Sequence, residues 1–418
     1  MTSATTDKLP ERALRWLVVG VGASGLGTGL GVVAFPLLAL RMTTNPLLIS
    51  GIAVAGGLPW LLVALPAGAL VDHAERKRLV LFVELLRALV VAAVALGAAT
   101  GQLPFAALYV AAFLVGTGET IVSAVSRVSV PLVVERAGRA RANGVVAAAQ
   151  GAGQQLAGPA IGGALFAVAR SLPFLSDAAC YVASGFLQRA GTPLVEATGL
   201  GSGRDAVSGV GIWSDVASGM RWFVQSASLR TLAAVVGSLA FCQSMVLSVL
   251  VLYATDVLHL GATGYGLLVA VPAVADIATN LLAHRVYDRL GGSRTLLLSG
   301  VTAGGAYILL GATSALVVAG AALVLETIAT AAGNVANVTM RQELIPRERF
   351  GLVNNAMRMC IMGLVPLGAV VAGLLTKWLG TRPTFLVAGA LQLLVLVVSR
   401  RALESVLEQG SPHAPPVA

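Results

Sequence analysis

Four carboxylates interrupt long apolar stretches of this sequence: Glu119, Asp177, Asp276 and Glu326. An ionisable side chain in hydrocarbon is costly, and inside membrane-spanning segments such groups serve in ion pathways, proton relays or substrate binding. Burial favours the neutral form of a carboxyl group, so each of the four is a candidate for taking up and releasing a proton. The alternative is that they only form hydrogen bonds between helices.

The positions of these carboxylates predict different roles. Glu119 and Glu326 occupy related places in the two halves of the chain and are the leading pair for proton coupling. Asp276 ranks next, because Asn280 lies four residues on and shares its helix face. Asp177 ranks last, because it lies nearest the predicted outer surface, where water would keep it ionised.

Uncharged polar side chains recur at helical spacing on the same predicted segments. Together with Asn280, the candidates for a substrate cavity are Gln150, Gln154, Thr330, Asn334 and Asn337. Their alternative role is again hydrogen bonding between helices. Arg127, near the inner end of its segment, is either an ion-pair partner or a cation that reaches to the membrane interface.

The segments that carry these residues are those of an integral membrane protein. The chain has 418 residues, 57% of them apolar and 11% charged, with a mean hydropathy of +0.86, whereas soluble domains carry about 25% charged residues. A membrane-spanning helix needs about 20 apolar residues. The sequence therefore predicts an all-α membrane protein with twelve spans, at about 16–40, 48–71, 79–99, 104–130, 143–169, 172–190, 229–254, 263–286, 295–313, 316–340, 352–376 and 383–400.

The longest interruption divides these spans into two groups of six. We expect an N-terminal bundle at 1–190, a cytoplasmic linker at 191–228, a C-terminal bundle at 229–403 and a disordered tail at 404–418. An amphipathic helix is expected from Trp213 to Arg230. If the N-terminus is inside, only Arg41, Arg170, Lys377 and Arg382 of the 28 cations fall outside, which predicts cytoplasmic termini. The net charge of +9 therefore reflects membrane orientation, and no nucleic-acid partner is expected.

A short polar hairpin joins the second and third predicted spans. It contains Gly68, Asp72, Arg76, Lys77 and Arg78. The pattern resembles the loop between helices two and three of the major facilitator superfamily, with His73 and Glu75 as departures. The hairpin recurs 216 residues later, from Asp288 to Arg294, and Glu119-Thr-Ile recurs as Glu326-Thr-Ile. The resemblance implies two pseudo-symmetric six-helix bundles and a conformational latch at both hairpins, with Asp72 near Asn354 and Asn355 and Asp288 near Asn143.

The fifth predicted span contains a set of small residues that allows close helix packing and a proline that bends the helix. The set is Gly144, Gly153, Gly158, Pro159, Gly162 and Gly163. It resembles the fifth-helix signature of drug/proton antiporters, except that Gly153 and Gly158 are one residue too far apart. Three further segments, from Ser176, Gly219 and Arg341, resemble the branch of the enterobactin exporter and macrolide efflux proteins.

The resemblance implies a secondary transporter of the plasma membrane, exporting a small, fairly apolar organic molecule in exchange for protons, and we expect it to be monomeric. An uptake symporter of the same fold is the nearest alternative. A non-transporting membrane sensor or a membrane-embedded enzyme is the alternative of another class. No cofactor or metal is expected, since the four histidines lack metal-ligand spacing and no Walker-type phosphate loop occurs.

Overall fold

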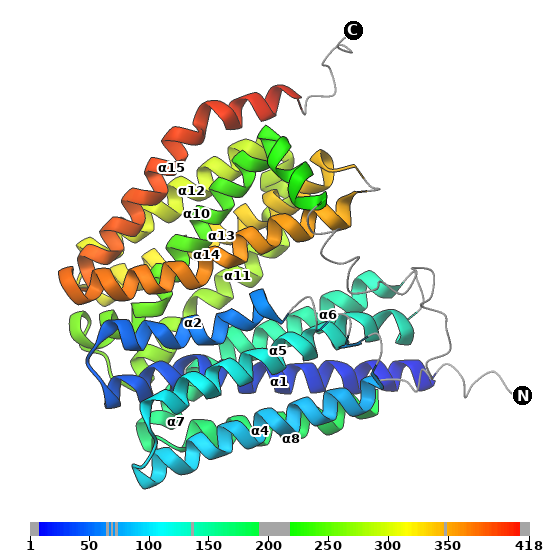
Figure 1. The fold of residues 1–418 in the computed structure, drawn as a ribbon, viewed down its shortest axis with the longest axis vertical. Helices are drawn as coiled ribbons and strands as arrows, with labels where there is room; N and C mark the ends of the chain where they lie inside the picture. Colours follow the sequence, from blue (N-terminus) through cyan, green and yellow to red (C-terminus); the bar gives the residue numbers. More distant parts are fainter. Residues whose placement is uncertain are drawn as a thin grey trace, which may run out of the picture. The chain divides into compact units, whose positions relative to one another are not determined.

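The computed structural model describes residues 8–63, 67, 70–71, 74–134, 138–191, 218–346 and 349–409. The described residues are almost entirely helical and include no strand (Figure 1). The first group of helices is α1 (Lys8–Met42), α2 (Pro46–Leu62), α4 (Arg76–Thr100), α5 (Phe105–Val133), α6 (Arg139–Gly151), the π-helical η2 (Ala152–Ala157), α7 (Gly158–Val168) and α8 (Leu172–Gly191). The second is α10 (Ala227–Leu252), the π-helical η3 (Tyr253–Val257), α11 (Ala262–Leu290), α12 (Gly292–Ala312), α13 (Leu316–Leu344), α14 (Phe350–Leu379) and α15 (Thr381–Gln409).

In each of the twelve ranges that the sequence predicts as spans, the described residues are mainly helical. Among the described residues, nine helices are long and apolar enough to cross a membrane. The three other ranges correspond to α2, which has 17 residues in the structure, to α8 with its polar Asp177 and Gln188, and to the stretch that η2 divides into α6 and α7. The all-α membrane architecture predicted from composition is therefore confirmed.

The helices of the chain form two compact units. Unit 1 comprises Met1–Gly201 with Ala254–Ala273, and unit 2 comprises Ser202–Tyr253 with Val274–Ala418. In unit 1, α8 packs against α1 and α4, α2 packs against α5, and α1 also contacts η2 and α7. In unit 2, α12 packs against α13 and α15, and α10 packs against α14 and α15. The first part of α11 groups with unit 1, whereas the sequence places all of 229–403 in the second bundle.

The π-helical turn η2 explains the irregular spacing of the glycine motif. The N–H of Gly158 donates to the carbonyl of Gly153, a bond between residues five apart that accommodates one extra residue in the turn. Both glycines consequently stay on the face that meets α1. A methyl group on Gly153 would lie 2.7 Å from the Gly22 carbonyl oxygen, and one on Gly158 would lie 2.5 Å from Gly29 Cα. The added residue is thus absorbed locally and the packing face is kept.

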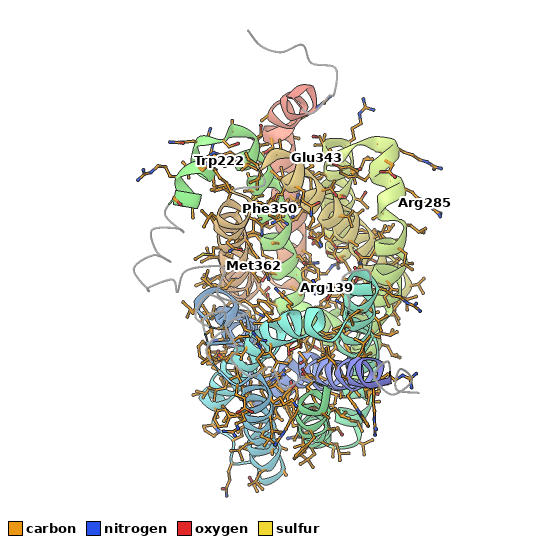
Figure 2. All side chains as sticks on the ribbon, turned by 90° about the vertical axis from the view of Figure 1, so that its right-hand side faces the viewer. Arg139, Trp222, Arg285, Glu343, Phe350 and Met362 are labelled. Atoms are coloured by element: carbon orange, nitrogen blue, oxygen red, sulfur yellow. The ribbon has the colours of Figure 1, made fainter. Side chains whose placement is uncertain are left out.

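Two predicted boundaries are wrong. The surface helix expected from Trp213 to Arg230 is helical over 218–225, which carries Trp222 (Figure 2). It is interrupted at Ser226, which has an extended backbone. The Ser226 side chain caps α10 by accepting a hydrogen bond from the N–H of Leu229. The predicted tail begins too early, because α15 continues to Gln409. Residues 192–217 and 410–418 lie outside the described residues.

Candidate functional site

A buried arginine on α4 is the centre of the polar cluster in unit 1. The side chain of Arg87 is 1% exposed. Its Nη1 donates to Glu84 Oε2 at 3.1 Å, and its Nη2 donates to Glu119 Oε2 at 2.8 Å. Glu84 lies one helical turn before Arg87, and Glu119 comes from the neighbouring helix α5. One guanidinium thus binds two carboxylates away from water, which requires good geometry and further hydrogen bonds to be stable.

Helices α1 and α8 supply further partners for this guanidinium. Nη1 donates to Ser24 Oγ at 2.9 Å, and Nη2 lies 2.9 Å from both Thr28 Oγ1 and the Tyr181 hydroxyl. The guanidinium carbon also lies 3.9 Å from the centre of the Tyr181 ring, within the range of a cation–π contact. Side chains of four helices therefore meet at Arg87.

Both acid partners of Arg87 have three hydrogen-bond donors each. Glu84 accepts from Arg87, from Ser184 at 2.7 Å and from Gln188 at 3.2 Å. Glu119 accepts from Arg87, from Thr28 at 3.0 Å and from Gln150 at 3.1 Å. Donors of this number stabilise the ionised form of a carboxyl group.

Asp177 lies in the same unit with different surroundings. Its side chain is fully buried on α8, so the expectation that water keeps it ionised is wrong. Neither carboxyl oxygen has a hydrogen-bond partner among the described residues. The glycine face of α1 covers it, since a methyl group on Gly27 would lie 2.5 Å from Oδ1. The glycine-rich stretch of α1 is therefore a packing surface at this point.

In unit 2 the corresponding buried carboxylate is Glu326 on α13, which is 5% exposed. Its Oε1 accepts hydrogen bonds from Gln243 at 3.0 Å and from the Tyr307 hydroxyl at 3.1 Å. Thr327 donates to Oε2 at 3.4 Å. All of these donors are neutral, and within the described chain no cation forms an ion pair with Glu326.

The two glutamates take their partners from corresponding helices of each half. Glu119 is bound from α1, through Thr28, and from α4, through Arg87. Glu326 is bound from α10, through Gln243, and from α12, through Tyr307. These are the first and third helices of each predicted six-helix half, so the repeat seen in Glu-Thr-Ile extends to the surroundings of the glutamate. The donor on the third helix differs between the halves, since it is Arg87 for Glu119 and Tyr307 for Glu326.

The remaining predicted polar residues are only partly brought together. Asn280 donates to Asp276 Oδ1 at 3.0 Å, so these two share a helix face as predicted. Gln150 contacts Glu119, whereas no partner of the half-buried Gln154 is described. The predicted polar stripe after Glu326 does not form one shared surface. Asn337 is buried, Asn334 is exposed, and the Thr330 hydroxyl donates to the backbone carbonyl of Glu326. Arg127 is exposed, unlike Arg87.

The latch residues are described only in part. Gly68 and Asp72 lie outside the described residues, so the contacts predicted for Asp72 stay a prediction, as do those of Asp288. Arg78 forms an exposed ion pair with Glu75 at 2.7 Å. Next to the exposed Asp288, the Tyr287 hydroxyl donates to Glu343 (labelled in Figure 2), at 3.0 Å to Oε1 and 3.1 Å to Oε2. Partial burial, and then this carboxylate, raise the pKa of Tyr287 to about 12.

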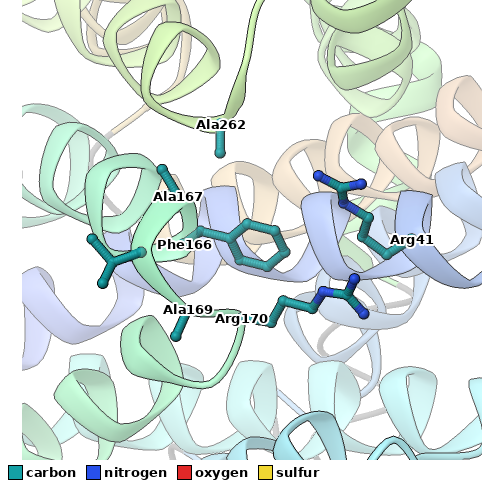
Figure 3. A pocket seen from close by; sticks show the side chains of 7 residues that line it. Arg41, Phe166, Ala167, Ala169, Arg170 and Ala262 are labelled. Carbon is teal, nitrogen blue, oxygen red and sulfur yellow. The ribbon is translucent and has the colours of Figure 1, made fainter.

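Two cavities lie within single units. The one in unit 1 has a volume of about 490 Å³ and is lined by Arg41, Phe166 and Arg170 (Figure 3). The one in unit 2 has a volume of about 530 Å³ and lies between α11, α12 and α13. Its walls are alanine, leucine, isoleucine and valine side chains with four hydroxyl groups, from Thr279, Thr295, Ser299 and Thr302. Both volumes fall in the range of small-molecule sites.

Several central residues of the clusters were not predicted. Glu84 and Arg87 lie within the third predicted span, so the rule that singles out charged residues in apolar runs applies to them equally. Their spacing of three residues also indicates an ion pair on one helix face. Tyr181, Gln243 and Tyr307 carry no such signal, because their role depends on which helices pack together.

These features define a class of protein: a multi-pass helical membrane protein with two similarly built halves and a buried acidic residue in each. The chain belongs to the Major Facilitator Superfamily, whose sequence profile matches residues 17–216 and 232–416. It is therefore a membrane transporter and not an enzyme.

The chain is also similar in sequence to an individual transport protein. The chain is 32% identical over 217 residues to the multidrug efflux pump Tap of Mycolicibacterium fortuitum, an alignment that covers 51% of this chain and 52% of that pump. The chain thus matches about half the length of this relative.

Solved structures show the same fold at low sequence identity. A bacterial homologue of the human lysosomal transporter Spinster, inward-facing and occupied, has a TM-score of 0.74 and 14% identity, covering 96% of this chain and 98% of that one. A bacterial homologue of the iron transporter ferroportin, also inward-facing, has a TM-score of 0.71 and 18% identity, covering 96% of this chain and all of that one.

Proposed function

We propose that this transporter exports a small, fairly apolar organic molecule from the cytoplasm in exchange for protons. It works as a monomer in the plasma membrane, with both termini in the cytoplasm. The observation that carries the proposal is the environment of Glu326, a buried carboxylate whose hydrogen-bond donors among the described residues are all neutral. Such a group can gain or lose a proton without breaking an ion pair, which is what coupling to a proton gradient requires.

Two observations support export over uptake. The relative named Tap is a multidrug efflux pump. The glycine and proline set from Gly144 to Gly163 resembles the antiporter signature, and η2 keeps Gly153 and Gly158 on one face despite the added residue.

The cavity in unit 2 supports the proposed substrate class. Its apolar walls and four hydroxyl groups favour a molecule with a largely hydrocarbon surface and a few hydrogen-bonding atoms. A drug, an antibiotic or a hydrophobic siderophore has this chemistry. A highly charged metabolite would leave its charges unpaired against these walls.

Transport in proteoliposomes tests the proposal. The purified protein should move a lipophilic dye or antibiotic against its gradient when a pH difference is imposed, and a protonophore should abolish this movement. Equal flux with and without the pH difference would instead indicate facilitated diffusion or another coupling ion. The complete absence of flux for a broad panel of small organic molecules would favour the alternative of a non-transporting membrane sensor. Inhibitory concentrations measured in a pump-deficient host would identify the substrates to use.

Amide substitutions test which carboxylates couple. Replacing Glu119, Asp177, Asp276 or Glu326 by its amide removes the titrating proton and preserves size. We expect Glu326→Gln to lose gradient-driven efflux and to keep substrate binding, while Glu75→Gln, at an exposed ion pair, serves as the control. If all four variants still pump against a gradient, proton coupling through these side chains is wrong.

A further inference from the structure

We infer that Asp177 is the carboxyl group that holds a proton in unit 1, and that Glu84 and Glu119 are both ionised around Arg87. This inference deepens the proposed function, because it assigns a proton-binding site to the half of the protein that contains an ion-pair network. The distribution of hydrogen-bond donors and the balance of charge among the buried groups both indicate this assignment.

The charges of the cluster do not balance if every group is ionised. Among the described residues of unit 1, the buried charged side chains are Glu84, Arg87, Glu119 and Asp177, three acids and one base. With all three acids ionised the buried cluster would carry two excess negative charges, which is costly in an environment of low dielectric constant. At least one acid is therefore expected to hold a proton.

The donors identify which acid this is. Glu84 and Glu119 each accept three hydrogen bonds, including one from the guanidinium of Arg87. Asp177 accepts none among the described residues, although it is fully buried. Of the three acids, Asp177 would therefore be the least stable in its ionised form, because no hydrogen bond among the described residues replaces its lost contacts with water. The desolvation cost of a neutral carboxyl group is much smaller.

The groups around Asp177 are consistent with a neutral side chain. Helix α1 presents the backbone of Gly27 and Gly31 to it and no charged group. Its own helix adds Cys180 and Tyr181. The Tyr181 hydroxyl accepts a hydrogen bond from Arg87 Nη2 at 2.9 Å and lies 3.3 Å from Thr28 Oγ1, and its own proton remains available as a weak donor toward Asp177. The charged groups that act on it come from α4 and α5, namely Arg87 as the one cation and Glu84 and Glu119 as two anions.

Release of this proton would affect Arg87. The guanidinium has one N–H, at Nε, without an acceptor in the described structure. An ionised Asp177 would compete with Glu119 for this cation and weaken the contact of Arg87 with α5. The protonation state of Asp177 on α8 would thereby control the strength of the ion pair between Arg87 and Glu119. Glu119 in turn accepts a hydrogen bond from Gln150 on α6.

Infrared difference spectroscopy of the purified protein tests the inference directly. A neutral carboxyl group has a C=O stretching band distinct from that of a carboxylate. The spectrum of the wild-type protein minus that of Asp177→Asn should show the loss of one such band at neutral pH. The corresponding spectra of Glu84→Gln and Glu119→Gln should show the loss of carboxylate absorption instead. Asp177→Ser provides the same comparison if Asp177→Asn does not fold.

The outcomes separate this inference from the proposed function. Unchanged neutral-carboxyl absorption in both Asp177 variants, or loss of that band in Glu84→Gln or Glu119→Gln, would overturn the assignment even if the wild-type protein pumps with a proton gradient. A band assigned to Asp177 supports it even if the liposome assay shows no proton coupling. Since Asn resembles the neutral acid, Asp177→Asn should also keep the melting temperature of the wild-type protein.

Discussion

Helix α4 and its N-cap residue Glu75 provide two Glu–Arg pairs with the same spacing and opposite exposure. Glu75 and Arg78 form an ion pair at 2.7 Å near the start of the helix, with side chains 46% and 82% exposed. Glu84 and Arg87 form one at 3.1 Å, with side chains that are 0% and 1% exposed. Burial decides what each pair contributes, because water screens the first and is absent from the second.

This comparison gives a prediction for single residues. Glu84→Gln should destabilise the protein by about 1–3 kcal/mol, because the amide accepts less well from the buried donors of Arg87, Ser184 and Gln188, while Glu119 still balances the charge of Arg87. Glu75→Gln should change stability by less than about 1 kcal/mol. Thermal unfolding of both variants in the same detergent measures the difference. Equal losses in the two variants would show that Glu84 does not hold Arg87.

At the scale of elements, the contact between α1 and the segment α6–η2–α7 depends on small residues at some positions of the motif and not at others. A methyl group on Gly158 would meet Gly29 Cα at 2.5 Å, whereas one on Gly144 would meet nothing within 4 Å. Members of one sequence motif thus differ in their structural role.

Alanine at these two positions tests that difference. Gly158→Ala should cost about 1–3 kcal/mol, because the helices must separate to admit the methyl group. Gly144→Ala should be neutral or stabilising by up to about 1 kcal/mol, because alanine is the better helix former. Unfolding of the purified variants checks both values. A destabilised Gly144→Ala with an unaffected Gly158→Ala would contradict the described packing.

The π-helical turn gives a second prediction at this scale. Deleting the exposed Gln155 should convert η2 into regular α-helix and restore the shorter glycine spacing, so the protein should still fold. Deleting Ala164 in the regular helix α7 should rotate all that follows by about 100° and prevent folding. Size-exclusion chromatography of the two variants distinguishes these results. Aggregation of the Gln155 deletion would mean that the turn is needed for folding itself.

For the whole molecule, the repeated hairpins predict control over the alternation between inward-open and outward-open states. A carboxylate at a helix N-terminus contributes about 0.3–2 kcal/mol. Asp72→Asn should therefore shift the ratio of the two states by roughly 2- to 30-fold toward inward-open, and Asp288→Asn should act in the same direction.

Spin labels on the exposed positions 141 and 289 would report that shift as a change in the distribution of their separation. The wild-type protein with the same labels is the reference, and Glu75→Gln is the control for a nearby change of charge. Unchanged distances together with unchanged transport in Asp72→Asn would mean that Asp72 only balances the neighbouring arginines.

The sequence by itself determined the class of protein and much of its architecture. The twelve apolar runs of membrane length correctly predict helix among the described residues, because backbone groups in lipid must be bonded within the segment. Glu119 and Glu326 are recognisable from sequence as well, since charge in such a run is rare enough to indicate a role.

Only the tertiary structure decided which groups meet. Asp177 is predicted to be near water from its place along the chain, yet the glycine face of α1 covers it completely. Arg87 joins side chains of four helices, and no spacing along one helix encodes which residues of another will face it. Periodicity fixes the face on which a side chain lies, whereas its partners, and with them its charge state, depend on how helices distant in sequence pack together.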